Sequence, residues 1–264
     1  MQTKSKDIKL PILIAFALSS TLAISCQKEA VVSNNHKLAL DVISSSKNNS
    51  ATSINLNQGL VAYYPFTGNA NDASGNGYNG NPLNVTLTID RRGKKKSAYL
   101  FDKVDSYVDV SNKPIVGYGN SPRSIFAWAK TTDNTQYVRI FAGGSTSPGQ
   151  SFNILLMWNG IPVFMGWHPY DFLPNSGVSI TDGKWHLIGI TYDGNILKTW
   201  VDGINQNTCT ISLNTVGNNN LIGYPNEIGT YGVTTDHRFK GALDEFRFYN
   251  RVLTQSEITY LSTH

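Results

Sequence analysis

The sequence predicts an all-β fold, a sandwich of two antiparallel sheets followed by one short helix. In the stretch 185–203, WHLIGITYDGNILKTWVDG, two runs of alternating residues each end in Asp-Gly. Such period-2 runs are typical of paired antiparallel strands, because type I′ turns need residues that tolerate positive φ. No helical periodicity of useful length precedes Leu253. With 40% hydrophobic residues, 13 Tyr and 11 Phe, the chain of 264 residues can fill one sizeable core.

Other strands are predicted from shorter runs, taken in chain order. They cover residues 60–66, 81–89, 97–102, 105–110, 124–130, 138–142, 152–158, 161–166, 208–211, 221–224 and 238–249. In the run 124–130 the period places Ala127 and Trp128 on opposite faces. We interpret Trp128 as packing in the core or on a sheet face, with a ligand platform as the alternative. Thr254 and Glu257 have the spacing of a capping box, which predicts a helix through Leu261.

The first 26 residues have the form of an export signal. Three lysines precede the apolar stretch 10–22, which is too short for an ordinary membrane-spanning helix. The run that ends in Ser25 and Cys26 resembles a lipobox, which implies that Cys26 is the lipidated N-terminus of a bacterial lipoprotein. A conventional secretory signal is the alternative. Residues 27–29 resemble a surface-export tag, so we expect an anchor in the outer membrane, with exposure at the cell surface.

Residues 27–57 are rich in Ser, Asn and Lys and predict a flexible tether, because they lack the apolar surface needed to offset the entropy of ordering. Residues 58–264 form the predicted domain. Cys209 is the second of two cysteines. If Cys26 is lipidated, no intramolecular disulfide can form, and we interpret Cys209 as a small buried hydrophobe.

The charge distribution argues against a dedicated nucleic-acid binder. The formal net charge is +4, but from Asn57 onward 16 Lys and Arg residues stand against 15 Asp and Glu residues. A nucleic-acid protein concentrates basic residues on its folded domain. The basic run Arg91–Lys96 is interpreted as a solvated turn, with a contact to an anionic glycan as the alternative.

Three collinear motifs carry a family resemblance. They are the hairpin 185–203, the opening run GLVAYYPFTGNANDASGNG at 59–77, and the closing run FKGALDEFRFYNRVLT at 239–254. Together they resemble laminin G-like domains with the concanavalin A-like lectin-glucanase jelly roll, over residues 59 to 262. The resemblance implies the jelly-roll fold. It leaves the function open, because one fold hosts many functions.

The loop 69–77 is the predicted metal site. Its carboxylate, amide and carbonyl oxygens suit calcium. The resemblance implies that Asp72 and Asp244 converge on one ion, with contributions near Asn69 and Ser74, and that the ion has a structural role. The alternative is that Asn, Gly and Asp only form turns here.

Catalytic motifs are not recognisable in the sequence. Laminarinase-like enzymes of this fold carry an E-x-D-x-x-E strand, whose carboxylates act as nucleophile and acid. This chain has four Glu residues and no such strand. Asp244 and Glu245 are adjacent, so a regular strand would point them to opposite faces. No polysaccharide lyase motif is recognisable either, and we expect no enzyme.

An aromatic stretch, residues 158–176, provides the predicted ligand site. Exposed aromatic rings stack on the C–H faces of sugars while neighbouring polar groups bind the hydroxyls. The expected ligand residues are Trp167, His168, Tyr170 and Phe172, extended by Tyr224 and Tyr231. The alternative is a loop that packs back on the core.

The functional hypothesis is a non-catalytic surface or periplasmic lipoprotein module that binds carbohydrate or mediates adhesion. A glycan-active hydrolase or lyase of the same fold is one alternative. A structural, protein-binding component of a surface assembly is the other. The sequence predicts neither the identity of the glycan nor the oligomeric state.

Overall fold

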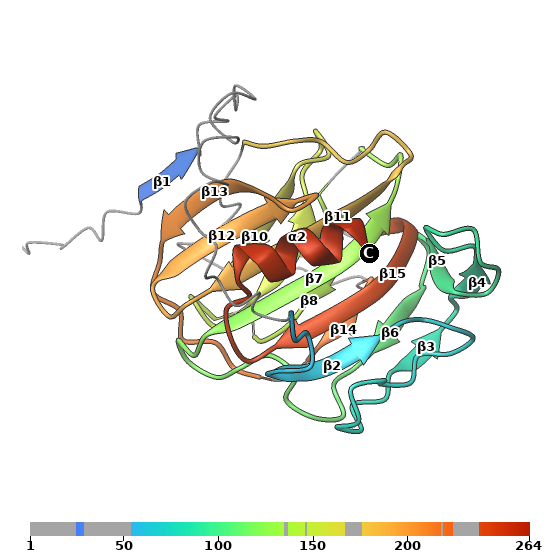
Figure 1. Ribbon diagram of the computed structural model, residues 1–264, viewed down its shortest axis with the longest axis horizontal. Coiled ribbons are helices and arrows are strands. Elements are labelled where there is room, and N and C mark those ends of the chain that lie inside the picture. The colour runs from blue at the N-terminus through green and yellow to red at the C-terminus, as the bar shows by residue number, and fades with distance from the viewer. Residues whose placement is uncertain are drawn as a thin grey trace, which may run out of the picture.

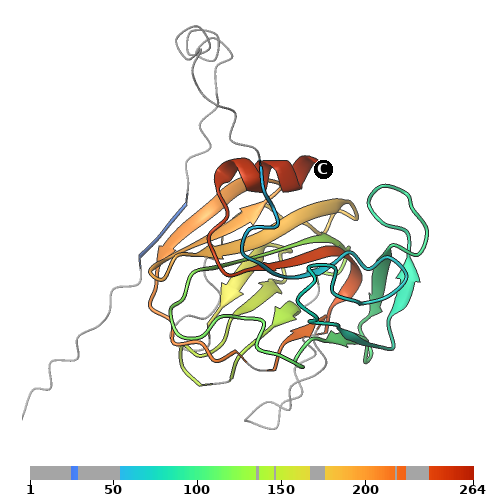
Figure 2. The same ribbon diagram turned by 60° about the horizontal axis from the view of Figure 1, so that its bottom comes forward.

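The computed structural model describes residues 25–28, 54–134, 137–145, 147–166, 176–217, 219–223 and 238–264. Over these residues two antiparallel sheets lie face to face, with one helix on the outside of the larger sheet (Figures 1 and 2). The predicted two-layer all-β fold is confirmed. Within the described residues no helix is long and apolar enough to cross a membrane.

The strands within this part of the chain form a nine-stranded and a six-stranded sheet. The larger sheet contains β1 (Ser25–Lys28), β2 (Leu60–Tyr64), β4 (Thr86–Thr88), β5 (Ala98–Asp102), β7 (Arg123–Lys130), β11 (Trp185–Tyr192), β12 (Ile196–Val201), β13 (Ile204–Thr210) and β15 (Lys240–Tyr249). Its order is β1-β13-β12-β11-β7-β15-β5-β4, with β2 also paired to β15. The smaller sheet contains β3 (Asn81–Leu83), β6 (Tyr107–Asp109), β8 (Val138–Ala142), β9 (Asn153–Leu156), β10 (Pro162–Met165) and β14 (Leu221–Ile222). Its order is β10-β9-β8-β14-β6-β3.

The core lies between the two sheets and is rich in aromatic rings. Phe141 of β8 lies 5.1 Å from Phe248 of β15, measured between ring centroids, and both side chains are buried. Burial of one such side chain stabilises the fold by roughly 1.5–3 kcal/mol. Strand β7 alternates as predicted, with Ala127 in this core and Trp128 on the outer face of the larger sheet.

The predicted central hairpin is present as β11 and β12, with Ile188 opposite Val201 and Tyr192 opposite Leu197. Its connection spans three residues, and of the predicted Asp193-Gly194 pair only Gly194 has positive φ. A type I′ turn does occur at the second Asp-Gly, where Asp202 has φ +50° and Gly203 has φ +80°. That turn joins β12 to β13.

The prediction of one strand over 81–89 is wrong. Residues 81–83 form β3 of the smaller sheet, whereas residues 86–88 form β4 of the larger sheet. Asn84, between them, has φ +50°. Asn tolerates this left-handed conformation better than most residues, and the chain leaves one sheet for the other at this point.

Helix α2 (Gln255–Thr263) begins at the predicted capping box. The Thr254 hydroxyl accepts from the Glu257 amide, and the Glu257 carboxylate accepts from the Thr254 amide. The buried residues Ile258 and Leu261 pack with Phe126 and Trp200 on the outer face of the larger sheet. Helix α2 therefore covers part of this face.

Cys26 and Cys209 are joined by a disulfide, opposite each other on β1 and β13. Cys209 is buried, as expected, but the expectation that it has no partner is corrected in this structure. A lipid attached to Cys26 would use the same Sγ atom, so lipidation and the disulfide exclude each other in one molecule. Lipidation of Cys26 stays a prediction.

Candidate functional site

A β-bulge in β15 brings two carboxylates to one face of the larger sheet. Asp244 pairs with Trp128 and Arg247 pairs with Phe126, so three steps along β15 match two steps along β7. The additional residue, Glu245, has φ +53°. The expectation that Asp244 and Glu245 point to opposite faces is therefore wrong. The bulge also marks the point where β15 changes its other neighbour from β5 to β2.

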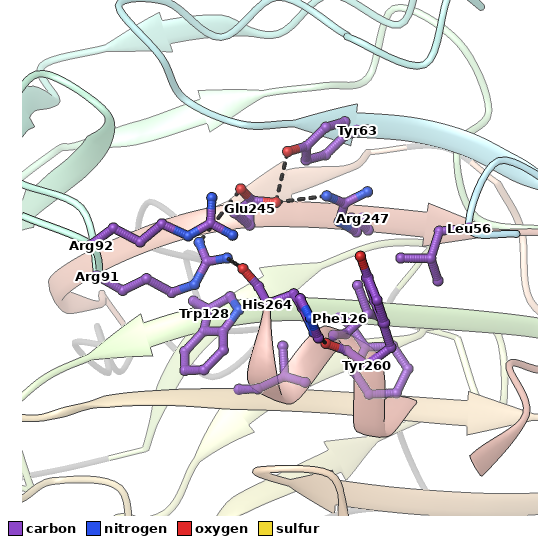
Figure 3. A pocket seen from close by; sticks show the side chains of 12 residues that line it. Leu56, Tyr63, Arg91, Arg92, Phe126, Trp128, Glu245, Arg247, Tyr260 and His264 are labelled. Carbon is purple, nitrogen blue, oxygen red and sulfur yellow. Dashed lines mark hydrogen bonds and ion pairs between the residues drawn. The ribbon is translucent and has the colours of Figure 1, made fainter. Parts of the chain in front are cut away.

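Arg91, from the turn after β4, binds both carboxylates. Its Nη1 lies 3.0 Å from Oδ2 of Asp244 and 3.4 Å from Oε1 of Glu245. Its Nη2 donates to the main-chain oxygen of His264 at 2.7 Å, and the guanidinium lies 4.9 Å from the centroid of the Trp128 ring. Arg91 thus connects the β4 turn, the bulge and the end of α2 (Figure 3).

The second oxygen of Glu245 is also occupied. Oε2 accepts from the Tyr63 hydroxyl and from Nη2 of Arg247, each at 2.7 Å. The Arg247 guanidinium lies 3.6 Å from the centroid of the Tyr63 ring. Glu245 is therefore held by two guanidinium groups and one hydroxyl, which gives it a single orientation (Figure 3).

The two carboxyl groups have pKa values shifted in opposite directions. Burial, together with the charge of Glu245, raises the pKa of Asp244 to about 7 against the attraction of Arg91. Burial alone would also raise the pKa of Glu245, but the Tyr63 hydroxyl, Arg247 and Arg91 hold it below its usual value. Divergent pKa values are typical of acid–base pairs, yet here the carboxylate oxygens of Glu245 already bind internal partners.

The bulge borders a pocket of about 250 Å³, which we call the arginine pocket (Figure 3). It lies between β2, β7, β15, the β4 turn and the end of α2. Its lining residues are Leu56, Tyr63, Arg91, Arg92, Phe126, Trp128, Leu187, Glu245, Arg247, Tyr260, Leu261 and His264. Three of them are arginines and one is a carboxylate.

A second hollow of about 690 Å³ lies on the same sheet, and we call it the Trp185 groove. It is lined by Thr88, Ile89, Asp90, Leu100, Phe101, Asp102, Lys130, Thr131, Thr132, Gly183, Trp185, Lys240, Gly241 and Ala242. Ile89 is 52% exposed and Leu100 is 44% exposed, which gives the groove an apolar floor. Within the described part of the chain, the ammonium groups of Lys130 and Lys240 have no ion-pair partner.

The two hollows are neighbours along the strands. On β7, Lys130 lines the Trp185 groove and Trp128 lines the arginine pocket, two residues away. Trp185 and Leu187 of β11 have the same relationship. Since residues two apart on a strand lie on one face about 7 Å apart, the hollows adjoin each other beside the turn that contains Arg91.

A family model for the concanavalin A-like lectin/glucanases superfamily, in its laminin G form, matches residues 102–259. This match covers more than half of the chain. The chain belongs to this superfamily. The predicted family resemblance is thereby confirmed, and so is the predicted jelly-roll class. The hairpin 185–203 and the closing run 239–254 lie within the matched residues, and the opening run 59–77 precedes them.

Solved structures agree with membership of this superfamily. Domain 4 of AbnA, a GH43 extracellular arabinanase from Geobacillus stearothermophilus, in complex with arabinotriose, is similar with a TM-score of 0.60 and 24% identity, over 77% of this chain and 98% of that one. The binding domain of Paraclostridial Mosquitocidal Protein 1 has a TM-score of 0.60 and 16% identity, over 79% of this chain and 52% of that one. The receptor binding domain of botulinum neurotoxin D has a TM-score of 0.55 and 16% identity, over 79% and 53%. At these identities the likeness shows the fold. No curated protein sequence matches the chain.

The predicted aromatic ligand residues are not tested. Trp167, His168, Tyr170, Phe172, Tyr224 and Tyr231 lie outside the described residues. Trp158, at the start of the same stretch, is described. It is 52% exposed in the turn between β9 and β10, and its ring lies 4.9 Å from that of Tyr137.

The predicted metal loop is organised by its own side chains. Oδ1 of Asp72 accepts from the amides of Tyr63 and Ser74 at 2.9 and 2.8 Å. Oδ2 accepts from the Ser74 hydroxyl and the Tyr78 amide at 2.8 and 3.0 Å. Asn69 accepts from the Asn71 amide, as in an Asx turn. These bonds fasten the loop to β2.

The four predicted calcium ligands are engaged with different partners. Asp72 binds four donors within its loop and β2, whereas Asp244 is 2% exposed and binds the Arg91 guanidinium. Among the described residues no group of three His, Cys, Asp or Glu side chains is arranged to hold a metal. Calcium binding stays a prediction.

Proposed function

We propose that this chain is a non-catalytic carbohydrate-binding module, and that the Trp185 groove is where the glycan binds. The observation that carries the proposal is the combination of size and lining in this groove. Its volume lies within the usual range of ligand sites, roughly 300–1,000 Å³. Such sites have mainly apolar walls with a few polar groups that fix orientation.

The chemistry of the groove suits a neutral sugar chain. The Trp185 ring and the exposed Ile89 and Leu100 offer apolar area to the C–H faces of sugar rings. The ammonium groups of Lys130 and Lys240 supply donors for hydroxyl oxygens. Except for Ile89, which directly follows β4, these residues project from paired strands, so their backbone positions are fixed before a ligand arrives, which lowers the entropic cost of binding.

The acid pair at the bulge favours binding over hydrolysis. Glycosidases of the common mechanism use two carboxyl groups that both reach the scissile bond. Asp244 is 2% exposed, and both oxygens of Glu245 are occupied by Arg91, Arg247 and Tyr63. A substrate would have to break these ion pairs to use either carboxylate. The structurally similar arabinanase domain was solved with arabinotriose, which makes arabinan oligosaccharides sensible first ligands.

A glycan array of neutral oligosaccharides, arabinotriose included, tests the proposal with the full chain in mild detergent. We expect Trp185→Ala to abolish retention, while the control Trp158→Ala, at an exposed tryptophan that does not line the groove, leaves it intact. Equal melting temperatures establish that both variants are folded. If Trp185→Ala retains the glycan as the parent chain does, the proposal that the glycan binds in the Trp185 groove is wrong. Release of shorter or unsaturated products from the same glycans contradicts the non-catalytic role.

The second part of the proposal is a lipid anchor at Cys26, which would hold the module at the outer membrane of a bacterium. It is supported by the lipobox-like run that ends at Cys26 and by the Ser- and Asn-rich segment behind it. Intact-mass analysis of protein extracted from membranes tests it. We expect a diacylglyceryl and acyl mass on Cys26 and a free thiol at Cys209. A Cys26–Cys209 disulfide in the extracted protein would contradict the anchor.

A further inference from the structure

We propose that the arginine pocket is a second binding site, for an anionic sugar unit such as a uronate or a sulfated residue. This inference goes beyond the neutral groove, although it rests on the proposal that the chain binds glycans. The two hollows adjoin, so one polysaccharide chain with both neutral and acidic units could occupy both. The inference depends on three features of the pocket: its excess of positive charge, one guanidinium without a hydrogen-bond or ion-pair partner among the described residues, and its aromatic lining.

The charge balance of the pocket is positive. Three guanidinium groups line it, from Arg91, Arg92 and Arg247, against the single lining carboxylate of Glu245. Asp244 lies behind Arg91 and also pairs with it. Among the lining side chains the cationic groups therefore outnumber the anionic ones, and this excess, reduced by Asp244 and Asp90 behind the wall, attracts an anion that enters the pocket.

Arg92 is the group available to a ligand. Its side chain is exposed and, within the described residues, makes no hydrogen bond or ion pair. Its main-chain amide donates to Oδ1 of Asp90 at 2.9 Å, which fixes the backbone from which the guanidinium projects. A guanidinium binds carboxylate and sulfate through parallel N–H bonds, with geometric specificity as well as charge.

The other two arginines are held in position by Glu245. Arg91 and Arg247 bind different oxygens of that carboxylate, so both guanidinium groups are oriented before any ligand binds. Each guanidinium has five N–H donors, and these ion pairs use only some of them. Nε of Arg247 is buried and has no hydrogen-bond partner. Glu245 is thus a positioning residue for the cationic wall.

The remaining wall of the pocket is aromatic. Tyr260 is 38% exposed, and its ring is stacked on that of His264 with 3.9 Å between centroids. Trp128 lies below Arg91. A sugar ring with its acidic group on Arg92 can place a C–H face against such rings. The volume of about 250 Å³ suits one sugar unit.

The test compares ligands with different charged groups. Trigalacturonate, its methyl ester and a κ-carrageenan tetrasaccharide, which carries sulfate and no carboxylate, are titrated calorimetrically into the full chain at low and at physiological salt. We expect trigalacturonate to bind more tightly than the neutral ester, and added salt to weaken it. The sulfated arm distinguishes a general anion site from one that prefers carboxylate. Equal affinity for the acid and its ester overturns the inference.

Variants separate this site from the neutral groove. Arg92→Gln should weaken the affinity for trigalacturonate by about tenfold or more, which is the effect expected when one charged hydrogen-bonding partner is lost. Arg92→Lys should retain part of the affinity, and Trp185→Ala should leave trigalacturonate binding to the arginine pocket measurable. If Arg92→Gln binds like the parent chain, the inference is wrong. Trp185→Ala could leave the binding of neutral glycans intact while Arg92→Gln loses trigalacturonate. That result contradicts the proposed glycan site in the Trp185 groove and supports the anion site in the arginine pocket.

Discussion

Oδ2 of Asp244 lies 3.0 Å from Nη1 of Arg91, and yet burial raises the pKa of Asp244 to about 7. The ordinary value is 3.8. At pH values between these two pKa values, the Asp244 carboxyl group binds more protons in the native state than in the unfolded chain. Stability contributed by this group is therefore present at low pH and is lost as the pH rises toward 7.

Asp244→Asn tests this pH dependence. The variant cannot ionise, so we expect its free energy of unfolding to fall less steeply between pH 4 and pH 7 than that of the parent chain. Urea denaturation at several pH values measures it. Asp105→Asn, at an exposed carboxylate, serves as the control for the loss of one carboxylate charge. Parallel pH profiles for Asp244→Asn and the parent chain would show that Asp244 is ionised throughout.

A second titration is expected at His186. Its Nδ1 lies 2.7 Å from Oδ2 of Asp202 and its Nε2 lies 3.0 Å from Oδ1 of Asp182. Burial lowers the pKa of His186, but the two carboxylates outweigh burial and raise it above its ordinary value. The protonated ring therefore stabilises the fold below the unfolded pKa, and this contribution is lost as the pH rises through the folded pKa.

NMR titration of the His186 ring measures that shift directly. We expect a pKa above that of an unfolded histidine, and a lower value in Asp182→Asn, which removes one of the two partners. Because Asp202 also accepts the Leu187 amide, substitution of Asp202 would disturb the turn as well, and Asp182 is the cleaner site. A ring that titrates below the ordinary histidine range would contradict the prediction.

Asp72 is expected to be important for stability whether or not calcium binds. Burial alone would raise the pKa of Asp72. The amides of Tyr63, Tyr78 and Ser74 donate to its carboxylate and hold this pKa below its usual value. Asp72→Ala leaves these donors without their acceptor and should lower the free energy of unfolding by about 2 kcal/mol or more. Ser74→Ala, which removes one donor of the four, should cost less.

Chelation separates the two roles of this loop. The melting temperature of the parent chain is measured in EDTA and again after calcium is restored. A fall in EDTA that calcium reverses supports the metal site expected at Asp72 and Asp244. An unchanged melting temperature, together with an unstable Asp72→Ala, assigns the loop to Asx-type hydrogen bonding alone.

The bulge in β15 is where the strand period predicts the positions of side chains least well. The period of 124–130 predicts that Ala127 and Trp128 lie on opposite faces, and in the structure Ala127 lies in the core and Trp128 on the outer face, because side chains alternate wherever a strand is regular. In β15, Leu243 and Phe246 both lie in the core although they are three residues apart. A regular strand predicts Asp244 and Glu245 on opposite faces, but the bulge between Asp244 and Arg247 inserts one residue and interrupts this alternation.

The two hollows depend on contacts between residues far apart in the sequence, which no local pattern encodes. The basic run Arg91–Lys96 is interpreted from the sequence as a solvated turn, with a contact to an anionic glycan as the alternative. In the structure Arg91 binds the bulge on β15, 153 residues away along the chain, and the wall beside it comes from helix α2. The loop 69–77 shows the converse, since its Asn and Asp side chains bond to amides two residues later, a local effect that composition does predict.

Gly189 provides a test of how the helix packs on the larger sheet. A Cβ atom at this position would lie 2.2 Å from Cδ1 of Phe126, whose ring is buried beneath α2. Gly189→Ala should therefore displace the ring and destabilise the fold by roughly 1–3 kcal/mol, as overpacking does. Denaturation of the single variant, of Phe126→Ala and of the double variant gives the coupling between the two sites. If the clash is the cause, the alanine at 189 costs less once the Phe126 ring is absent. An equal cost in both backgrounds would assign the effect to the backbone of β11 and would leave the packing of α2 on this face without support.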